Sequence, residues 1–188
     1  KAAAAAISES SDMYLNAKSS IYCNIAKAQA KMEDLAAVKE TFRQAKAVAD
    51  KIEYDGRKFS AYEGIVRAQV EAGDIEGAEA IALGVTNEDS KSAIYAAIAE
   101  TQVKIGDITG AKATVKHVKK NDSWTYIYGR IVHSQVKAGN ITDAKATVAN
   151  IDDNSRKTKA YLDIIEAQAM AGDFSEAKST VENLDYYC

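Results

Sequence analysis

Residues 62–74 read YEGIVRAQVEAGD, and this arrangement recurs along the 188-residue chain. Gly-Asp or Gly-Asn pairs begin at Gly73, Gly106, Gly139 and Gly172, with a period of 33 residues, and Glu33-Asp34 holds the same place 40 residues before Gly73. Counted back from the first residue of each pair, the fourth residue is always Gln, the eighth always Ile and the eleventh always Tyr: Gln29, Ile25, Tyr22; Gln69, Ile65, Tyr62; Gln102, Ile98, Tyr95; Gln135, Ile131, Tyr128; Gln168, Ile164, Tyr161. Three matched columns in five copies indicate an internal repeat.

Each copy predicts a helical hairpin. Tyr, Ile and Gln at spacings of three and four residues fall on one face of a first helix. Gly then ends this helix in the left-handed conformation, and Asp or Asn caps the start of a second helix. The second helix continues with Ala and then a small or branched apolar residue four positions later, as in Ala78 and Ala82. The first copy has seven extra residues between Ala45 and Tyr54, close to two helical turns, which predicts one long helix over residues 34–52.

Composition narrows the class of protein. Lys and Arg number 24 and Asp and Glu 27, for a net charge of −3, which disfavours binding to a nucleic-acid backbone. No apolar stretch approaches the roughly 18 residues of a membrane-spanning helix, so we expect no membrane insertion. Cys23 and Cys188 make no disulfide framework, and His117 and His133 have no partners at metal-ligand spacing. We therefore expect a protein without a catalytic centre, metal or cofactor.

The chain divides into one short segment and one repeat domain. Residues 1–11 are rich in Ala and are expected to form a partial cap helix or an extension. Residues 12–188 are expected to form a single domain with units at about 12–53, 54–86, 87–119, 120–152 and 153–188. Because the chain starts at Lys1, an exported protein without its signal peptide and a trimmed cytoplasmic protein fit equally well, and the compartment stays open.

The pattern resembles the tetratricopeptide repeat. Tyr62, Ile65, Val66 and Gln69 take the first four places of the family signature, and Ala78 and Ala82 the next two. The chain departs from the signature in its Gln for Tyr, its absent closing Pro and a period one residue shorter. The resemblance implies an all-α fold, a right-handed α-α superhelix (solenoid) of five hairpins, with the first helices lining a concave groove that receives a peptide or a protein surface.

Carried over column by column, the resemblance places these partner-binding residues in the groove: Lys27, Glu63, Arg67, Glu100, Tyr126, His133 and Glu166. The row is cationic in the first two copies and acidic by the third and fifth. Small residues such as Ala93, Ala96 and Gly129 would leave space at its centre. The alternative interpretation is a solvated helix face that binds nothing, because soluble helices need a polar side.

The last second helix suggests another surface. Val181 and Leu184 have no further helix to cover them, and two tyrosines follow at Tyr186 and Tyr187, so we expect self-association or partner docking here. A trimmed natural cap is the rival explanation. Trp124, Met13 and Met32 are expected in the core, and Cys23 as a half-buried thiol.

Three classes of function compete. The leading one is a non-enzymatic scaffold or adaptor that organises a multiprotein complex. The second is a structural protein that acts mainly by homotypic association. An enzyme or small-molecule binder is the least expected, because an open solenoid does not readily provide an enclosed pocket.

Overall fold

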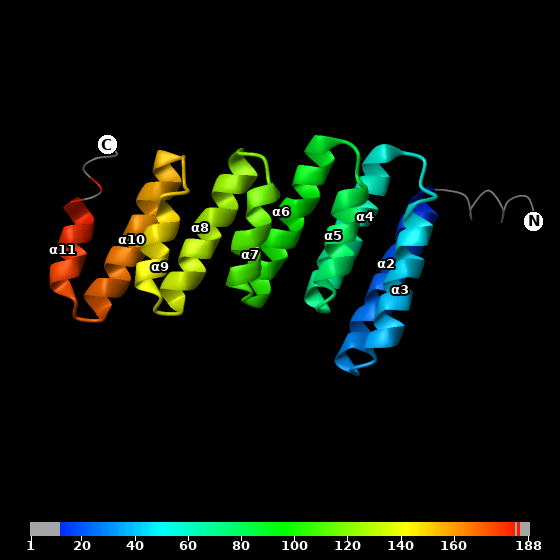
Figure 1. Cartoon of the computed structure of the whole chain (residues 1–188), viewed down its shortest axis with the longest axis horizontal. Helices are drawn as coiled ribbons and strands as arrows, with labels where there is room; N and C mark the ends of the chain where they lie inside the picture. Colours follow the sequence, from blue (N-terminus) through cyan, green and yellow to red (C-terminus); the bar gives the residue numbers. More distant parts are fainter. Residues whose placement is uncertain (1–11, 183, 185–188) are drawn as a thin grey trace, which may run out of the picture. The chain divides into compact units, whose positions relative to one another are not determined.

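The protein is all-helical throughout the part that the computed structural model describes, residues 12–182 and 184 (Figure 1). The elements are α2 (Asp12–Lys31), α3 (Leu35–Ala49), α4 (Asp55–Glu71), α5 (Ile75–Gly84), α6 (Glu88–Ile105), α7 (Ile108–Thr114), a 3-10 turn η1 (Val115–His117), α8 (Asp122–Lys137), α9 (Ile141–Val148), α10 (Asn154–Met170) and α11 (Phe174–Glu182). The all-α prediction is confirmed over these residues. The cap helix expected in residues 1–11 lies outside the described residues, as do Tyr186 and Tyr187.

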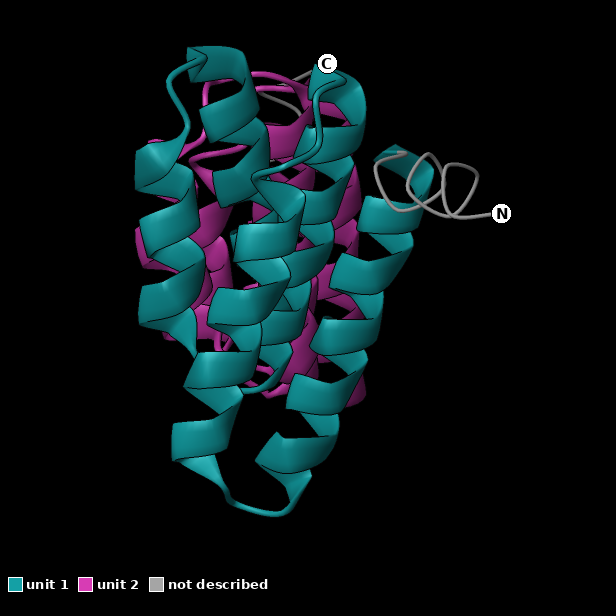
Figure 2. Ribbon diagram, turned by 90° about the vertical axis from the view of Figure 1, so that its right-hand side faces the viewer, with its two compact units in different colours: residues 1–101 teal, residues 102–188 magenta. Residues whose placement is uncertain are grey.

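The chain forms two compact units, residues 1–101 and 102–188, which divide within α6 (Figure 2). In the first unit, α2 packs on α3 and α4, and α4 packs on α5. In the second unit, α8 packs on α9, and α10 packs on α11 and on both helices of the preceding pair. Each unit therefore contains successive helix pairs in contact. Within the described ranges, none of the helices is both long enough and apolar enough to span a bilayer.

The hinge of each hairpin explains two of the repeated columns. At the second hinge, Gly73 adopts a φ of 84°, and the Asp74 amide donates a hydrogen bond to the Gln69 carbonyl at 2.8 Å. This is the Schellman arrangement, which needs a left-handed residue and so favours Gly. The Asp74 carboxylate then caps Gly77 N at 3.3 Å and accepts a bond from the Gln69 side-chain amide at 2.8 Å. Gln69 thus braces its own hinge.

The same brace recurs at the third hinge, where Gln102 Nε2 donates to Asp107 Oδ2 at 3.0 Å. The first hinge has Glu33 in the left-handed position, with a φ of 61°. A non-glycine residue there costs on the order of 1–2 kcal/mol. The hinge geometry is therefore kept even where the preferred residue is missing.

The Ile column forms the core in all copies but the first. Ile65, Ile98, Ile131 and Ile164 are fully buried, whereas Ile25 is 45% exposed. The first helix, α2, instead buries Leu15, Ser19, Cys23 and Ala26, so it presents a different face from the later first helices. Burial raises the pKa of the Cys23 thiol to about 11.

The predictions for the two early methionines are wrong. Met13 is 70% exposed and Met32 is 80% exposed. Met13 lies off the buried face of α2, and Met32 lies just past the end of that helix, in the turn before α3. Trp124, in contrast, is buried as expected, and its ring lies 4.6 Å from the ring of Tyr128 in an edge-to-face arrangement.

The long helix expected over residues 34–52 forms as α3, with Asp34 as its N-cap through a 3.1 Å bond from Ala37 N. It ends at Ala49, a few residues earlier than predicted. The loop that follows is tied to the start of α2, because the Asp12 carboxylate accepts bonds from Glu53 N at 3.0 Å and Tyr54 N at 2.9 Å. These two backbone bonds lower the pKa of Asp12.

Candidate functional site

In the first unit, the structure brings three predicted groove residues together in one ion-pair cluster. Arg67 Nη2 lies 2.8 Å from Glu63 Oε1 and 3.1 Å from Glu100 Oε2. Burial works against the charged form of Arg67, but the bonds to the two carboxylates outweigh it and raise the pKa of the guanidinium. Arg67 is thus fully engaged by acids of its own unit.

Lys27 is also matched within the first unit, with its Nζ 3.7 Å from Glu71 Oε2. Lys27 and Arg67 both line a groove of about 640 Å³ between α2 and α4, whose walls include the small residues Ser20, Ser60 and Gly64. The cationic row expected from the sequence therefore carries no uncompensated positive charge in this unit.

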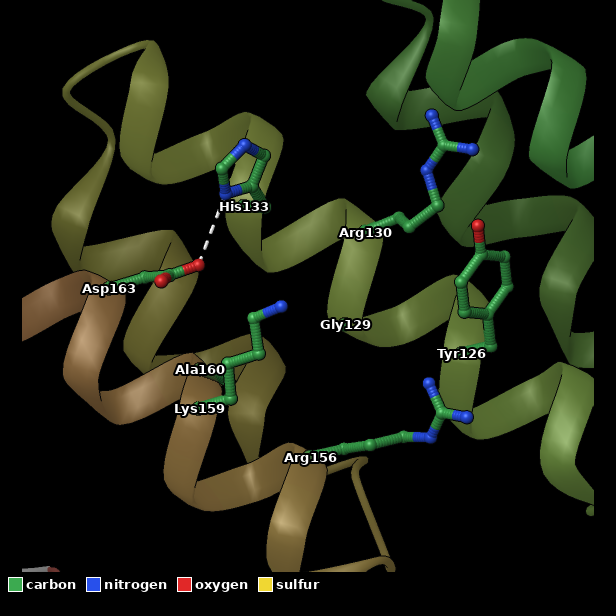
Figure 3. A pocket seen from close by; sticks show the side chains of 8 residues that line it. All are labelled: Tyr126, Gly129, Arg130, His133, Arg156, Lys159, Ala160 and Asp163. Carbon is green, nitrogen blue, oxygen red and sulfur yellow. Dashed lines mark hydrogen bonds and ion pairs between the residues drawn. The ribbon is translucent and has the colours of Figure 1, made fainter.

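In the second unit, Tyr126 and His133 of α8 face α10 across a pocket of about 310 Å³ (Figure 3). Its lining residues are Tyr126, Gly129, Arg130 and His133 from α8, and Arg156, Lys159, Ala160 and Asp163 from α10. Two of the predicted partner-binding residues thus lie together, and Gly129 lies between them as the spacious position that the sequence suggested. We call this site the α8–α10 pocket.

The α8–α10 pocket has an excess of positive charge. It holds the cations Arg130, Arg156 and Lys159, and none of the three forms an ion pair with any described carboxylate. The one acid in its lining, Asp163, is already committed, with Oδ2 3.1 Å from His133 Nδ1. This is a local exception in a chain whose net charge is −3.

The aromatic ring of Tyr126 holds the two arginines near the pocket. The guanidinium carbons of Arg130 and Arg156 lie 5.9 and 5.5 Å from the ring centroid, within cation–π range. In Figure 3 the Arg156 side chain runs from α10 toward Tyr126, and the Lys159 ammonium points toward α8. Contributions of about 0.5–1 kcal/mol per exposed pair orient the guanidiniums without neutralising them.

Gly129 leaves the pocket open at the helix that forms its floor. A methyl group placed on Gly129 would meet no atom of another part of the chain within 4 Å. Glycine inside a helix costs about 1 kcal/mol relative to alanine. The chain therefore carries an unfavourable helix residue at a place where a side chain would narrow the pocket.

Three charged lining residues were missed from the sequence: Arg130, Arg156 and Asp163. Arg130 and Asp163 stand nine residues before their hinges, beside the columns that were considered. Arg156 lies in the first turn of α10, which begins at Asn154, and its backbone N donates a hydrogen bond to the Asp153 carboxylate at 2.7 Å. A cation in a first helical turn opposes the helix dipole, and this was the available signal.

The remaining predicted residues lie apart from the pocket. Glu166 is exposed on α10 and does not line it. Val181 is 44% exposed, whereas Val148, in the same column of the previous copy, is fully buried. Leu184 is partly exposed. No group of three His, Cys, Asp or Glu residues suited to a metal ion occurs in the described part of the chain.

Comparison with protein-family models, with curated proteins and with solved structures found no match. The resemblance to the tetratricopeptide repeat therefore rests on the repeated columns themselves, and the site has to be argued from its own chemistry.

Proposed function

We propose that this protein is a non-catalytic scaffold or adaptor, a right-handed solenoid of five tetratricopeptide-like hairpins that helps to organise a multiprotein complex. It binds an acidic segment of a partner protein at the α8–α10 pocket. The observation that carries the proposal is the set of three cations in one pocket, Arg130, Arg156 and Lys159, without carboxylate partners among the described residues; the two arginines lie near the ring of Tyr126.

The chemistry of the pocket favours a peptide with carboxylates. An arginine guanidinium binds a carboxylate through two parallel hydrogen bonds, and a pocket of one sign selects a segment of the other. Arg156, Lys159 and His133 have exposed side chains on the rim, between two neighbouring helices. An extended segment can thus enter and leave the pocket without threading through an enclosed cavity.

A labelled ten-residue peptide of alternating Glu and Gly tests this function by fluorescence anisotropy with the full chain. We expect saturable binding that weakens as salt is raised, and at least a tenfold weaker affinity for Arg156→Ala/Lys159→Ala. The matched control is Arg57→Ala, because Arg57 takes the position of Arg156 in the second copy. Equal affinities for the double variant and the unmodified chain would contradict the proposal.

Homotypic association is the second candidate, favoured by two exposed core columns. Ile25 and Val181 are about half exposed, although their counterparts Ile65 and Val148 are fully buried. In repeat arrays such columns are covered by the neighbouring unit, which a second copy of the chain can supply at this surface of Val181 and Leu184.

Sedimentation velocity over a micromolar concentration range tests the second candidate. We expect Val181→Lys to shift the distribution toward monomer, because a charge on an apolar contact must be desolvated. Lys178→Glu, an exposed change on the same helix, serves as the control. A chain that is monomeric at every concentration excludes this mode of assembly.

A further inference from the structure

The α8–α10 pocket has more positive charge than one carboxylate can balance. Three cations face one carboxylate, so the excess is two charges when His133 is neutral. A Glu or Asp side chain of a partner brings a single negative charge. A phosphorylated Ser, Thr or Tyr brings about −1.5 to −2 at neutral pH, with three strong acceptor oxygens.

The donors are also placed for a multivalent anion. Arg156 and Lys159 are three residues apart on α10, so they project from the same side of that helix. Arg130 and Arg156 both lie near the ring of Tyr126, and Figure 3 shows their guanidiniums at opposite sides of that ring. Figure 3 shows the side chains of Tyr126, Arg156 and Lys159 around the open position at Gly129. A phosphoryl group at this position would have a guanidinium donor and an ammonium donor from α10, with the charge of Arg130 on the other side of the ring.

The acid in the pocket does not occupy this position. Asp163 is held at 3.1 Å by His133, at the other end of the pocket from Tyr126 in Figure 3. In Figure 3 the His133–Asp163 pair also lies apart from the guanidinium of Arg156. An incoming dianion is therefore not obliged to displace an existing ion pair.

We infer that the α8–α10 pocket recognises a phosphorylated side chain of the partner segment. Arg156 and Lys159 bind the phosphoryl oxygens, Tyr126 forms the side wall, and Arg130 adds positive charge behind that wall. This inference rests on the proposed function and names the chemistry of its ligand: phosphorylation of the partner would then switch its binding on.

The first experiment compares three peptides of one sequence that differ only at the central residue: Ser, Glu or phosphoserine. Isothermal titration of the full chain at low salt should give at least a tenfold tighter affinity for the phosphoserine peptide than for the Glu peptide, and the Ser peptide should not bind. Inorganic phosphate at millimolar concentration should compete with the phosphoserine peptide.

The second experiment closes the pocket without removing a charge. Gly129→Leu fills the open position, and leucine favours the helix more than glycine does, so loss of binding is not a result of unfolding. We expect the phosphoserine peptide to bind at least tenfold more weakly, with an unchanged or higher thermal midpoint. Gly64→Leu is the control, because Gly64 is also an open glycine inside a helix and lines the α2–α4 groove of the first unit.

The outcomes separate this inference from the proposed function. Equal affinity for the Glu and phosphoserine peptides overturns the inference and keeps the acidic-segment function. No binding of either peptide overturns both. Binding to vesicles that contain a phosphoinositide, without binding to the phosphoserine peptide, identifies a membrane site and also overturns the inference. An unchanged affinity in Gly129→Leu means that the phosphoryl group does not enter the pocket.

Discussion

The groove between α2 and α4 and the pocket between α8 and α10 are built from the same columns of the repeat. Thirteen and nine residues before their hinges, the first helices carry Ser20 and Asn24 in one unit and Tyr126 and Arg130 in the other; the following helices carry Ser60 and Gly64, and Lys159 and Asp163. Small neutral residues in the first unit thus correspond to aromatic and charged residues in the second.

The two units also differ in whether their cations are paired with carboxylates. In the first unit Arg67 is matched by Glu63 and Glu100, and Lys27 by Glu71. In the second unit Arg130, Arg156 and Lys159 lie along the pocket without acidic partners among the described residues. The repeat therefore determines where side chains converge, and the residues in each copy determine whether that place is neutral or ready for an anion.

The largest effect is expected from reversing charge in the second unit. Arg156→Glu/Lys159→Glu should weaken binding of the acidic peptide by at least about 100-fold, because each reversed charge costs about 1.4 kcal/mol or more, a factor of ten. Both side chains are exposed, so the fold should be retained. Anisotropy titration measures the loss, and circular dichroism checks the helix content.

The matched control places Glu at the same two columns in the first unit, with Arg57→Glu/Ser60→Glu. We expect less than a twofold change in peptide affinity, because the α2–α4 groove takes no part in binding. A comparable loss in both double variants would show that overall charge, and not the pocket, governs the interaction.

A transplant of the lining should come next in size. Ser20→Tyr/Asn24→Arg/Ser60→Lys gives the α2–α4 groove the aromatic wall and two of the cations of the α8–α10 pocket. All three positions are exposed, so the substitutions disturb no core. We expect the stoichiometry of acidic-peptide binding to rise from one to two, with the new site weaker by about tenfold because Arg57, at the position of Arg156, does not line the groove.

Isothermal titration reads both the stoichiometry and the affinity of the transplanted chain. Arg156→Ala/Lys159→Ala in the same background should leave only the new site. A stoichiometry that stays at one would mean that the column residues alone are not sufficient for peptide binding. The spacing of the two helices would then also be required.

The sequence predicts best those structural features that depend on the residues of one hairpin alone. The hinge follows from local chemistry, since the left-handed Gly73 and the Asp74 cap depend on neighbouring residues alone. The role of Gln69 was not foreseen in detail, because its bond to Asp74 appears only once the hinge has turned. The exposure of Ile25 was not predictable from its column, because α2 buries a different set of positions and a column does not report which face of its helix is buried.

The site was harder to predict, because it depends on how two first helices face each other. Tyr126 and His133 were found as groove columns of one helix. Arg156 and Asp163 belong to the next helix, and their approach to Tyr126 and His133 depends on the interhelical register, which no pattern within one helix contains. The same limit applies to Arg67, because its ion pair with Glu100 joins two successive copies.

A smaller effect is expected from releasing Arg67. Glu63→Gln/Glu100→Gln keeps the shape of both side chains and removes their charge. Ion pairs of this exposure contribute about 1 kcal/mol or less, so the free energy of unfolding should fall by about that amount. The freed guanidinium should give the first unit weak affinity for the acidic peptide, a few-fold above the unmodified groove.

Urea denaturation followed by circular dichroism measures the change in stability. The peptide titration is done in the Arg156→Ala/Lys159→Ala background, so that any binding measured comes from the first unit. Glu40→Gln, which breaks the exposed pair with Arg43 on α3, is the control and should not create peptide binding. No gain of binding in the Arg67 variant would mean that a free cation is insufficient without an aromatic wall such as Tyr126.

The smallest effect is expected from Asp12, whose carboxylate ties the start of α2 to the loop before α4. The pH dependence of the thermal midpoint tests this contact. The two backbone bonds that Asp12 accepts, from Glu53 and Tyr54, hold its pKa below the ordinary 3.8. A carboxyl whose pKa is lower in the folded state stabilises that state above its unfolded pKa, and this contribution is lost as the pH falls through the folded pKa. Asp12→Asn should therefore lower the thermal midpoint at pH 7 and match the unmodified chain near pH 2.

Glu79→Gln, at an exposed carboxylate outside these bonds, should behave like the unmodified chain at both pH values. If the gap between Asp12→Asn and the unmodified chain were as wide at pH 2 as at pH 7, the charge of Asp12 would not be what ties α2 to the loop before α4.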